Sequence, residues 1–145
     1  MSKYLLKAHN FYYRRIRELT DQVRHLHEKL SFEEFAQHPV VKLAQRVRQA
    51  DRDIIPKDPD RPEYRLRAEL KKFRRYKQGL KRYRLFFCFA DHPKIILYLY
   101  LNNEKHLRKD DDKNDPYEVF KKFVKQQKVS HDPQNPKIQQ WVRDY

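Results

Sequence analysis

The first third of the chain changes from a strand pattern to a helical one. Residues 4–8 form a short, largely apolar run of strand length, and over residues 10–30 apolar side chains recur at every third or fourth position. The next segment opens with Ser31 and Glu34, which have the S-x-x-E spacing of a helix capping box. These patterns predict a short strand, one long amphipathic helix, and a second helical segment that extends to Ile54.

Prolines divide and then end this helical part. Pro39 lies inside the second helical segment, where a proline interrupts the hydrogen-bond ladder and splits the segment into a short turn and a longer helix. Residues 56–62 contain three prolines and alternating charges, a composition that predicts a loop.

The following region has the composition of strands. Residues 73–77, 82–90 and 94–102 are rich in aromatic and β-branched side chains, and turn-forming residues separate them. They predict an antiparallel meander. Asp115 followed by Pro116 then predicts the start of a last helix, because an aspartate cap before a proline is typical of helix N-termini.

Residues 1–145 have the length of a single domain. Helices followed by strands predict an α+β fold, in which the N-terminal helices pack on a small antiparallel sheet with a C-terminal helix after it. We expect the other face of the sheet to be open and to carry the function. Residues 129–145, with two prolines and the only tryptophan, predict either a short helix or a flexible tail.

The charge of the chain narrows the choice of partner. There are 34 Lys and Arg against 20 Asp and Glu, which gives a formal net charge of +14. Such a surplus attracts polyanions from a distance, so nucleic acid is the first candidate and a solvated basic surface without a partner is the alternative. No helix combines a wholly apolar face with a Lys/Arg face, which disfavours binding to a membrane.

Cysteine content and the N-terminus indicate the compartment. Cys88 is the only cysteine, so an internal disulfide and a cluster of thiolate ligands are both excluded. The N-terminal apolar patch is only a few residues long, which fits neither a secretion signal nor a membrane-spanning helix. We therefore expect a cytoplasmic protein.

A basic run crosses the first two predicted strands of the meander. Residues 71–84 contain eight basic side chains and no acidic one. Because alternate residues of a strand share a face, Arg75 and Lys77 should lie together, and so should Arg82 and Arg84. Aromatic residues are interleaved with these cations, as on RNA-binding surfaces. An exposed strand face kept soluble by its charges is the alternative.

Two more candidates follow the third predicted strand. His106 and Arg108 lie where loops present side chains to ligands, and an imidazole can transfer protons, although an ordinary exposed histidine is the simpler interpretation. The consecutive acids Asp110, Asp111 and Asp112 lack the spacing of a calcium loop and are typical of a solvated turn.

The usual catalytic motifs are absent from the sequence. It has no phosphate-binding loop, no zinc-ligand spacing and no serine elbow, and its single glycine excludes most glycine-rich cofactor loops. No metal or other cofactor is therefore expected. RNA brings its own nucleophile, the 2′-hydroxyl, so cations that orient the phosphate and a proton acceptor suffice for cleavage.

Several motifs follow one another from the second predicted strand of the meander onward. In order, they are Arg82-Tyr83-Arg84-Leu85-Phe86-Phe87, Ile95-Ile96-Leu97, Asn103-Glu104, Leu107-Arg108 and Asp115-x-Tyr117-x-Val119-Phe120. Together with Leu6-x-Ala8-His9 near the N-terminus, they resemble the YhaV toxins of the RelE-like superfamily. The resemblance is strong over about residues 73–123 and weaker elsewhere.

This resemblance implies a RelE-like fold and a type II toxin, a ribosome-associated endoribonuclease that cleaves messenger RNA and inhibits translation and growth. It implies no cofactor. It also implies a PrlF-like antitoxin with an AbrB-type fold, through which the toxin contacts DNA only indirectly.

The resemblance also implies roles for individual residues. By position, Arg84 and Arg108 stabilise the scissile phosphate, and Tyr117, with His106 as the alternative, moves protons. The RNA backbone is expected to lie on the remaining cations, Arg75, Lys77, Arg82, Lys105 and Lys121. A non-catalytic RNA- or ribosome-binding module that uses the same cations is the second hypothesis, and a scaffold whose only partner is its antitoxin is the third.

Overall fold

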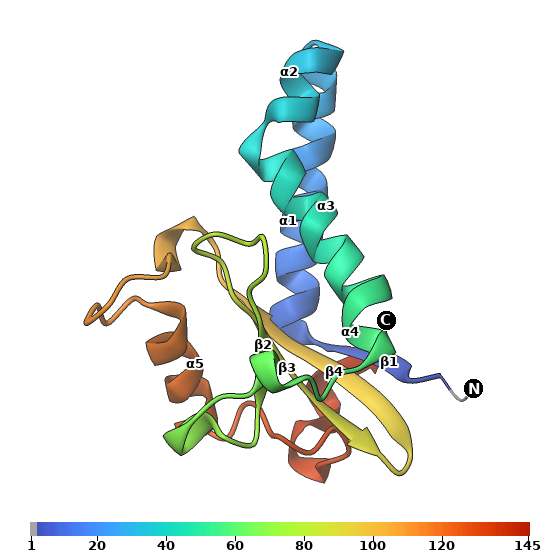
Figure 1. Ribbon diagram of the computed structural model, residues 1–145, viewed down its shortest axis with the longest axis vertical. Coiled ribbons are helices and arrows are strands. Elements are labelled where there is room, and N and C mark those ends of the chain that lie inside the picture. The colour runs from blue at the N-terminus through green and yellow to red at the C-terminus, as the bar shows by residue number, and fades with distance from the viewer. Residues whose placement is uncertain (1–2) are drawn as a thin grey trace.

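The structure is a computed structural model that describes residues 3–145. A helical hairpin stands on a five-stranded sheet, and a separate helix lies beside the sheet (Figure 1). The helices are α1 (Asn10–Lys29), α2 (Phe32–Gln37), α3 (Pro39–Gln49), α4 (Ile55–Lys57) and α5 (Pro116–Lys125), and the strands are β1 (Leu5–His9), β2 (Arg74–Tyr76), β3 (Leu85–Asp91), β4 (Lys94–Leu101) and β5 (Val142–Asp144). The predicted α+β class is confirmed.

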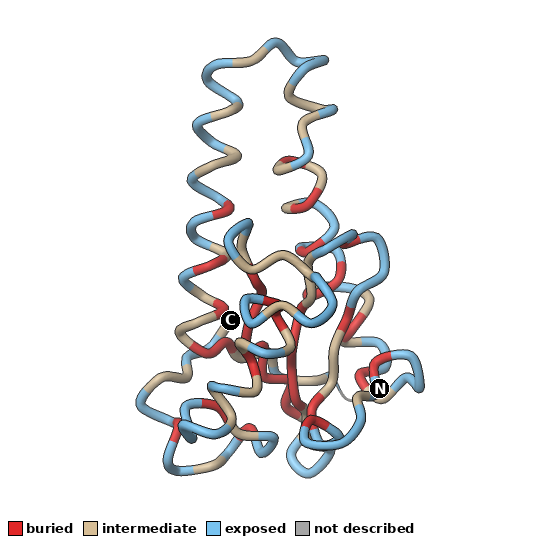
Figure 2. The backbone as a smooth tube through the Cα atoms, turned by 90° about the vertical axis from the view of Figure 1, so that its left-hand side faces the viewer, coloured by how far each residue is buried: buried red, intermediate tan, exposed pale blue. Residues whose placement is uncertain are grey.

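The hairpin forms where the capping signals predict it. The Ser31 side chain accepts a hydrogen bond from the Glu34 N–H, and the Glu34 carboxylate accepts one from the Ser31 N–H. His38 caps α3, and Pro39 is its first residue, which confirms the predicted division. The segment continues as one π-helical turn, Ala50–Ile54. The outer end of the hairpin is largely exposed, whereas the buried residues gather where it meets the sheet (Figure 2).

The sheet is mixed. Its order is β2-β3-β4-β1-β5, and β1 runs parallel to β4 while the other pairs are antiparallel. The predicted antiparallel meander is confirmed for β2, β3 and β4, but the prediction that the whole sheet is antiparallel was wrong, because β1 is parallel to β4. The reason is topological, because the long helical connection after β1 lets this first strand enter the sheet between β4 and β5 in the direction of β4.

Both faces of the sheet are covered, so the predicted open face was also wrong. Leu85 and Phe87 of β3 pack into a cluster with α1 and α3, whereas Phe86 and Cys88 pack against α5 and the C-terminal segment. Strands buried on both faces have nearly continuous apolar sequences, as β3 and β4 do. The candidate site consequently lies at one end of the sheet and not on its face.

The C-terminal residues 129–145 are part of the core. Val129 and Ile138 are buried against α5, and β5 pairs with β1 at the edge of the sheet. The Tyr145 hydroxyl donates a 2.6 Å hydrogen bond to the buried carboxylate of Asp51. Within residues 3–145, no helix is long and apolar enough to cross a membrane.

Candidate active site

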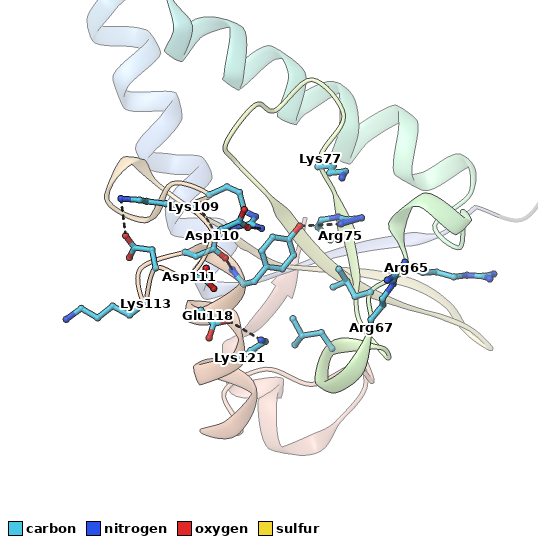
Figure 3. A pocket seen from close by; sticks show the side chains of 16 residues that line it. Arg65, Arg67, Arg75, Lys77, Lys109, Asp110, Asp111, Lys113, Glu118 and Lys121 are labelled. Atoms are coloured by element: carbon cyan, nitrogen blue, oxygen red, sulfur yellow. Dashed lines mark hydrogen bonds and ion pairs between the residues drawn. The ribbon is translucent and has the colours of Figure 1, made fainter.

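Tyr117 lies between two arginines at the start of α5. Asp115 caps this helix, because its carboxylate accepts a hydrogen bond from the Tyr117 N–H at 2.9 Å. The cap directs the tyrosine ring toward the ends of β2 and β3, where the Tyr117 hydroxyl accepts hydrogen bonds from Arg75 Nη1 at 3.3 Å and from Arg84 Nε at 3.2 Å. Figure 3 shows Arg75 on the β2 side of the pocket, from where it donates this hydrogen bond.

Backbone contacts hold both arginines in place. Arg75 is the central residue of β2, and its Nη2 donates to the Glu63 carbonyl at 2.9 Å. Arg84 directly precedes β3, and its Nη1 donates to the carbonyls of Lys81 and Tyr83 at 2.6 and 2.8 Å. Guanidinium groups fixed in this way can present their remaining N–H groups to an anion without first being ordered.

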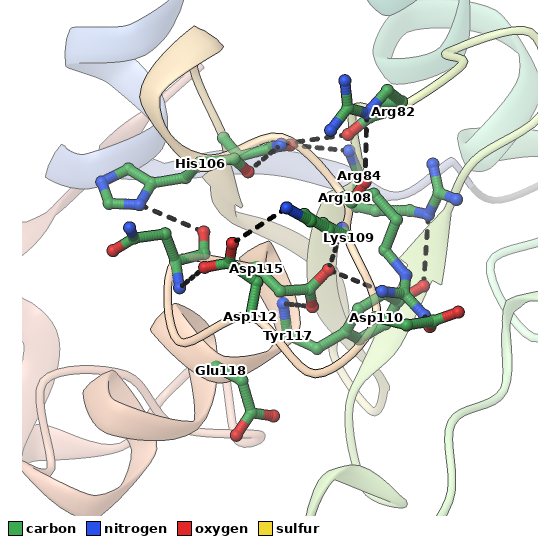
Figure 4. Close-up of polar contacts among 12 residues, drawn as sticks. Arg82, Arg84, His106, Arg108, Lys109, Asp110, Asp112, Asp115, Tyr117 and Glu118 are labelled. Atoms are coloured by element: carbon green, nitrogen blue, oxygen red, sulfur yellow. Dashed lines mark hydrogen bonds and ion pairs between the residues drawn. The ribbon is translucent and has the colours of Figure 1, made fainter.

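Arg108 closes the other side of the tyrosine (Figure 4). Its guanidinium lies 5.2 Å from the centre of the Tyr117 ring and pairs with Asp115 at 2.7 Å and with Asp110 at 2.5 Å. Partial burial lowers the pKa of Arg108, but the hydrogen bonds that it donates to Asp115 and Asp110 outweigh this effect, so its pKa is raised and its charge is permanent. The Asp115 side chain is nearly fully buried, whereas that of Asp110 is 86% exposed.

These groups border an open groove of about 890 Å³. Eight basic and five acidic side chains line it, so its net charge is positive. One wall is the loop that precedes α5 and the other comes from β2 and the loop before it (Figure 3). The lining residues are Arg65, Leu66, Arg67, Leu70, Arg75, Lys77, Arg108, Lys109, Asp110, Asp111, Asp112, Lys113, Asp115, Tyr117, Glu118 and Lys121.

Of the other predicted site residues, two line the groove. Lys77 follows β2 and is exposed, and Lys121 lies one turn after Tyr117 on α5. A hydrogen bond with Glu118 raises the pKa of Lys121. Lys77 and Lys121 thus provide positive charge at two edges of the groove.

Four predicted residues lie outside the groove lining, and one of them is Arg84, which still contacts Tyr117. Arg82 is exposed, and its Nε donates to the Arg108 carbonyl at 3.1 Å. Lys105 is exposed on the 3-10 helix Glu104–His106. The ring of His106 forms a 3.2 Å hydrogen bond with the Asn114 carbonyl.

The expected pairing of cations on a strand face was wrong in detail. Lys77 follows the last residue of β2, and both Arg82 and Arg84 precede β3, so only Arg75 of the four is within a strand. Lys81 has a left-handed backbone with φ of 55°, which turns the chain before it enters β3. Arg84 therefore reaches Tyr117 from a loop.

A buried asparagine that the sequence analysis missed organises this loop. The Asn102 side chain accepts a 2.7 Å hydrogen bond from the Arg84 N–H and donates to the carbonyls of Arg82 and His106 at 3.2 and 2.7 Å. It thereby joins the segment before β3 to the segment after β4. The only sequence feature that could have identified Asn102 was its position at the end of an apolar strand. The groove residues Arg65 and Arg67 had no identifying feature in the sequence beyond their charge.

The three consecutive acids lie on the groove wall. Asp110 pairs with Arg108, and Asp112 accepts a hydrogen bond from the Asn114 N–H and lies 4.0 Å from the Lys109 ammonium. Across residues 3–145, no group of three or more His, Cys, Asp or Glu side chains is placed to hold a metal ion.

Comparison with known proteins identifies the family. A family model described as a toxin with endonuclease activity, of a toxin-antitoxin system, matches residues 6–138. The chain belongs to the YhaV toxin family. The resemblance inferred from the sequence motifs is thereby confirmed.

Two curated members of the YhaV family are similar to this chain. Ribonuclease toxin YhaV of Escherichia coli (strain K12) and Toxin YhaV of Escherichia coli O157:H7 are each 33% identical to it over 98 residues. The match spans 64% of this chain and 64% of the length of these relatives. No solved structure is significantly similar to the chain.

Proposed function

We propose that this chain is the toxin of a type II toxin-antitoxin system, a metal-independent endoribonuclease of RelE-like fold that cleaves messenger RNA. One observation carries the proposal. The Tyr117 hydroxyl is held by Arg75 and Arg84 at the edge of a basic groove that is open to a polyanion. Membership of a family described by its endonuclease activity supports the same conclusion.

The arrangement suits cleavage by the RNA's own 2′-hydroxyl. This hydroxyl releases its proton to a water molecule as its oxygen attacks the adjacent phosphorus, a cyclic phosphate forms, and the bond to the 5′-oxygen of the next nucleotide breaks. Negative charge grows on the phosphate oxygens, where Arg75 and Arg84 can stabilise it. A single fixed donor of this kind contributes about 10²- to 10³-fold to the rate.

Tyr117 is proposed as the general acid. A phenolic oxygen accepts up to two hydrogen bonds and donates one. Both acceptor positions of Tyr117 are taken by Arg75 and Arg84, which leaves its own proton for the departing 5′-oxygen. General acid catalysis contributes about 10²- to 10⁴-fold. His106 remains the alternative proton carrier, but its ring would first have to leave the Asn114 carbonyl.

Arg108 is proposed to bind a phosphate by exchanging one of its partners. Its pairing with buried Asp115 also organises the cap of α5, whereas Asp110 is exposed and can be displaced at low cost. A phosphate in the place of Asp110 would keep Arg108 neutralised on both sides. Lys77, Lys121 and the outer cations Arg82 and Lys105 are proposed to hold the RNA backbone.

The partners follow from this proposal. The toxin acts on messenger RNA in association with the ribosome in the cytoplasm, and a PrlF-like antitoxin of AbrB type neutralises it. The antitoxin, and not the toxin, is proposed to contact DNA.

The test is expression of the chain in growing cells, followed by mapping of RNA 5′ ends. We expect new ends inside translated messages, and we expect both Tyr117→Phe and Arg84→Ala to remove them while leaving the fold intact by circular dichroism. Tyr13→Phe is the matched control, because no hydrogen bond of its hydroxyl occurs within residues 3–145. Messages that stay intact while the chain still binds RNA would replace the nuclease with the non-catalytic binding module.

A further inference from the structure

A second hollow lies beside the C-terminal end of α5, the helix whose first turn carries Tyr117. It has a volume of about 470 Å³ and lies between the loop at Ala68–Phe73 and the C-terminal segment. Its lining includes the apolar side chains of Phe73, Val129 and Ile138, all of which belong to the core beneath it. The floor is therefore rigid and apolar.

The rim of this hollow is basic and polar. Lys71, Lys72 and Lys137 line it, and within residues 3–145 none of these ammonium groups forms an ion pair. Glu69 is the only acidic side chain among the lining residues. The exposed ring of His131 lies nearly perpendicular to the ring of Phe73, at 6.2 Å between ring centres, and adds an aromatic side chain to the rim.

A band of lysines connects the hollow to the Tyr117 groove. Between the two lies a smaller depression that shares Lys113, Glu118 and Lys121 with the groove and Glu69 with the hollow. Its other lining residues are Lys122 and Lys125 of α5. From Tyr117 to Lys125 this helix is about 12 Å long, so the two depressions are close enough for one short strand of RNA to occupy both.

We propose that the hollow is a second RNA subsite, which holds an unstacked base of the substrate strand a few nucleotides from the scissile phosphate. An apolar floor, a flat ring and hydrogen-bonding side chains suit a nucleobase, and unpaired lysines suit the phosphates on either side of it. The assignment of this strand as substrate rests on the nuclease proposed above. The hollow itself takes no part in bond cleavage.

The first measurement is binding of single-stranded RNA by fluorescence anisotropy, in full-length chains that carry Tyr117→Phe to prevent cleavage. A 15-nucleotide RNA is long enough to reach both depressions, whereas a dinucleotide is too short to occupy both. The test variant is Lys72→Ala with Lys137→Ala. The control is Lys29→Ala with Lys57→Ala, which removes the same charge from exposed lysines in the helical half of the chain.

We expect the test variant to bind the 15-nucleotide RNA about tenfold more weakly at 0.15 M salt, with a salt slope lower by about 1.4, because two phosphate contacts are lost. Its affinity for the dinucleotide should change by less than twofold, and the control should match the parent with both RNAs. Equal losses in the control and test variants would overturn the subsite, because they would reflect net charge alone.

The proposed binding of a base in the hollow is tested with a series of 15-nucleotide RNAs, each of which carries one abasic nucleotide at a different position. One position, distinct from the cleavage site, should cost about tenfold in affinity, as the loss of a stacked base does. If no position is sensitive, the assignment to a base is wrong. If the variant with Lys72→Ala and Lys137→Ala binds vacant ribosomes more weakly than the parent but binds the 15-nucleotide RNA equally well, the hollow binds ribosomal RNA. The proposal that it binds the substrate strand is then overturned.

Failure of the subsite can be told from failure of the nuclease. Cleavage that is lost in Tyr117→Phe, together with unchanged RNA affinity in the lysine variant, would overturn the subsite alone. The expected affinity changes without any cleavage by the parent chain would support an RNA site at the hollow and overturn the nuclease.

Discussion

Removal of one hydroxyl group at the C-terminus should measurably destabilise the whole domain. Tyr145 donates a 2.6 Å hydrogen bond to Oδ2 of Asp51, a carboxylate that is fully buried between the hairpin and the sheet. Tyr12 donates the second bond to the same oxygen at 2.7 Å, while Oδ1 of Asp51 has no hydrogen-bond partner within residues 3–145. Tyr145→Phe therefore leaves a buried carboxylate with one donor in place of two.

The expected cost follows from the charge of the acceptor. A hydrogen bond to a charged group contributes about 1.5–3 kcal/mol, so Tyr145→Phe should lower the free energy of unfolding by about 2 kcal/mol at pH 8. For a domain of this size, this corresponds to a decrease in Tm of about 4–8 °C. The ring remains, and with it the cation–π contact of Arg52 at 4.1 Å, so the change isolates the hydroxyl.

The decrease in the free energy of unfolding caused by Tyr145→Phe should also depend on pH. Burial raises the pKa of Asp51, although the hydrogen bonds from Tyr145 and Tyr12 oppose this shift. Because the folded-state pKa is raised, the stability that Asp51 contributes is fully present when it is protonated and is lost as pH rises through that pKa. Loss of the Tyr145 hydroxyl raises the pKa of Asp51 further, so the penalty should grow with pH as Asp51 ionises, from about 1 kcal/mol for the neutral acid to about 2 kcal/mol for the carboxylate.

Urea denaturation of the Tyr145→Phe variant and the parent at pH 4, 6 and 8 measures this difference. Tyr13→Phe serves as the control and should change the free energy of unfolding by less than about 0.5 kcal/mol at each pH. A Tyr145→Phe penalty below about 0.5 kcal/mol at pH 8, or one that is the same at all three pH values, would refute the reasoning.

Three further predictions concern the core and the site. Asp115→Ala should lower the free energy of unfolding by about 2–4 kcal/mol in urea denaturation, because it removes the cap of α5 and the acceptor of two partly buried hydrogen bonds, from the Arg108 guanidinium and the Lys109 N–H. Glu118→Ala on the same helix should change the free energy of unfolding little. Phe120→Ala removes a fully buried ring that stacks against the sheet, so it should lower the free energy of unfolding by about 3–5 kcal/mol. In the same assay Phe32→Ala should have almost no effect, because Phe32 is 84% exposed. Arg84→Lys should leave the Tm unchanged but reduce the rate of RNA cleavage about 100-fold, because an ammonium cannot reproduce the three hydrogen bonds of the fixed guanidinium. A cleavage rate within threefold of the parent's would contradict this prediction.

The sequence alone determined the elements whose causes are local. The capping box at Ser31, the break at Pro39 and the Asp115 cap each act within one helical turn, and each was found where the pattern predicted it. The strongly basic run and the family motifs likewise pointed to Arg84 and Arg108 as candidates from their order along the chain. These features are readable because their spacing is short and their residue types are few.

The arrangement of the sheet was decided only by the tertiary structure. The position of β1 between β4 and β5, and its parallel direction, depend on a connection through the whole helical half of the chain. The cover on the second face depends on where α5 and the C-terminal residues pack. Periodicity within a strand reports that a face is buried, but it does not identify what buries it.

The site depended on long-range packing most of all. Arg75 and Tyr117 are 42 residues apart in the sequence, and their hydrogen bond exists only because β2 and the start of α5 meet at one end of the sheet. Asn102 looked like the polar end of a strand, although it joins the two segments that carry Arg84 and His106. The sequence showed a run of candidate cations, but only the packed core decided which of them face the same tyrosine, because a side chain's direction depends on the elements packed around it.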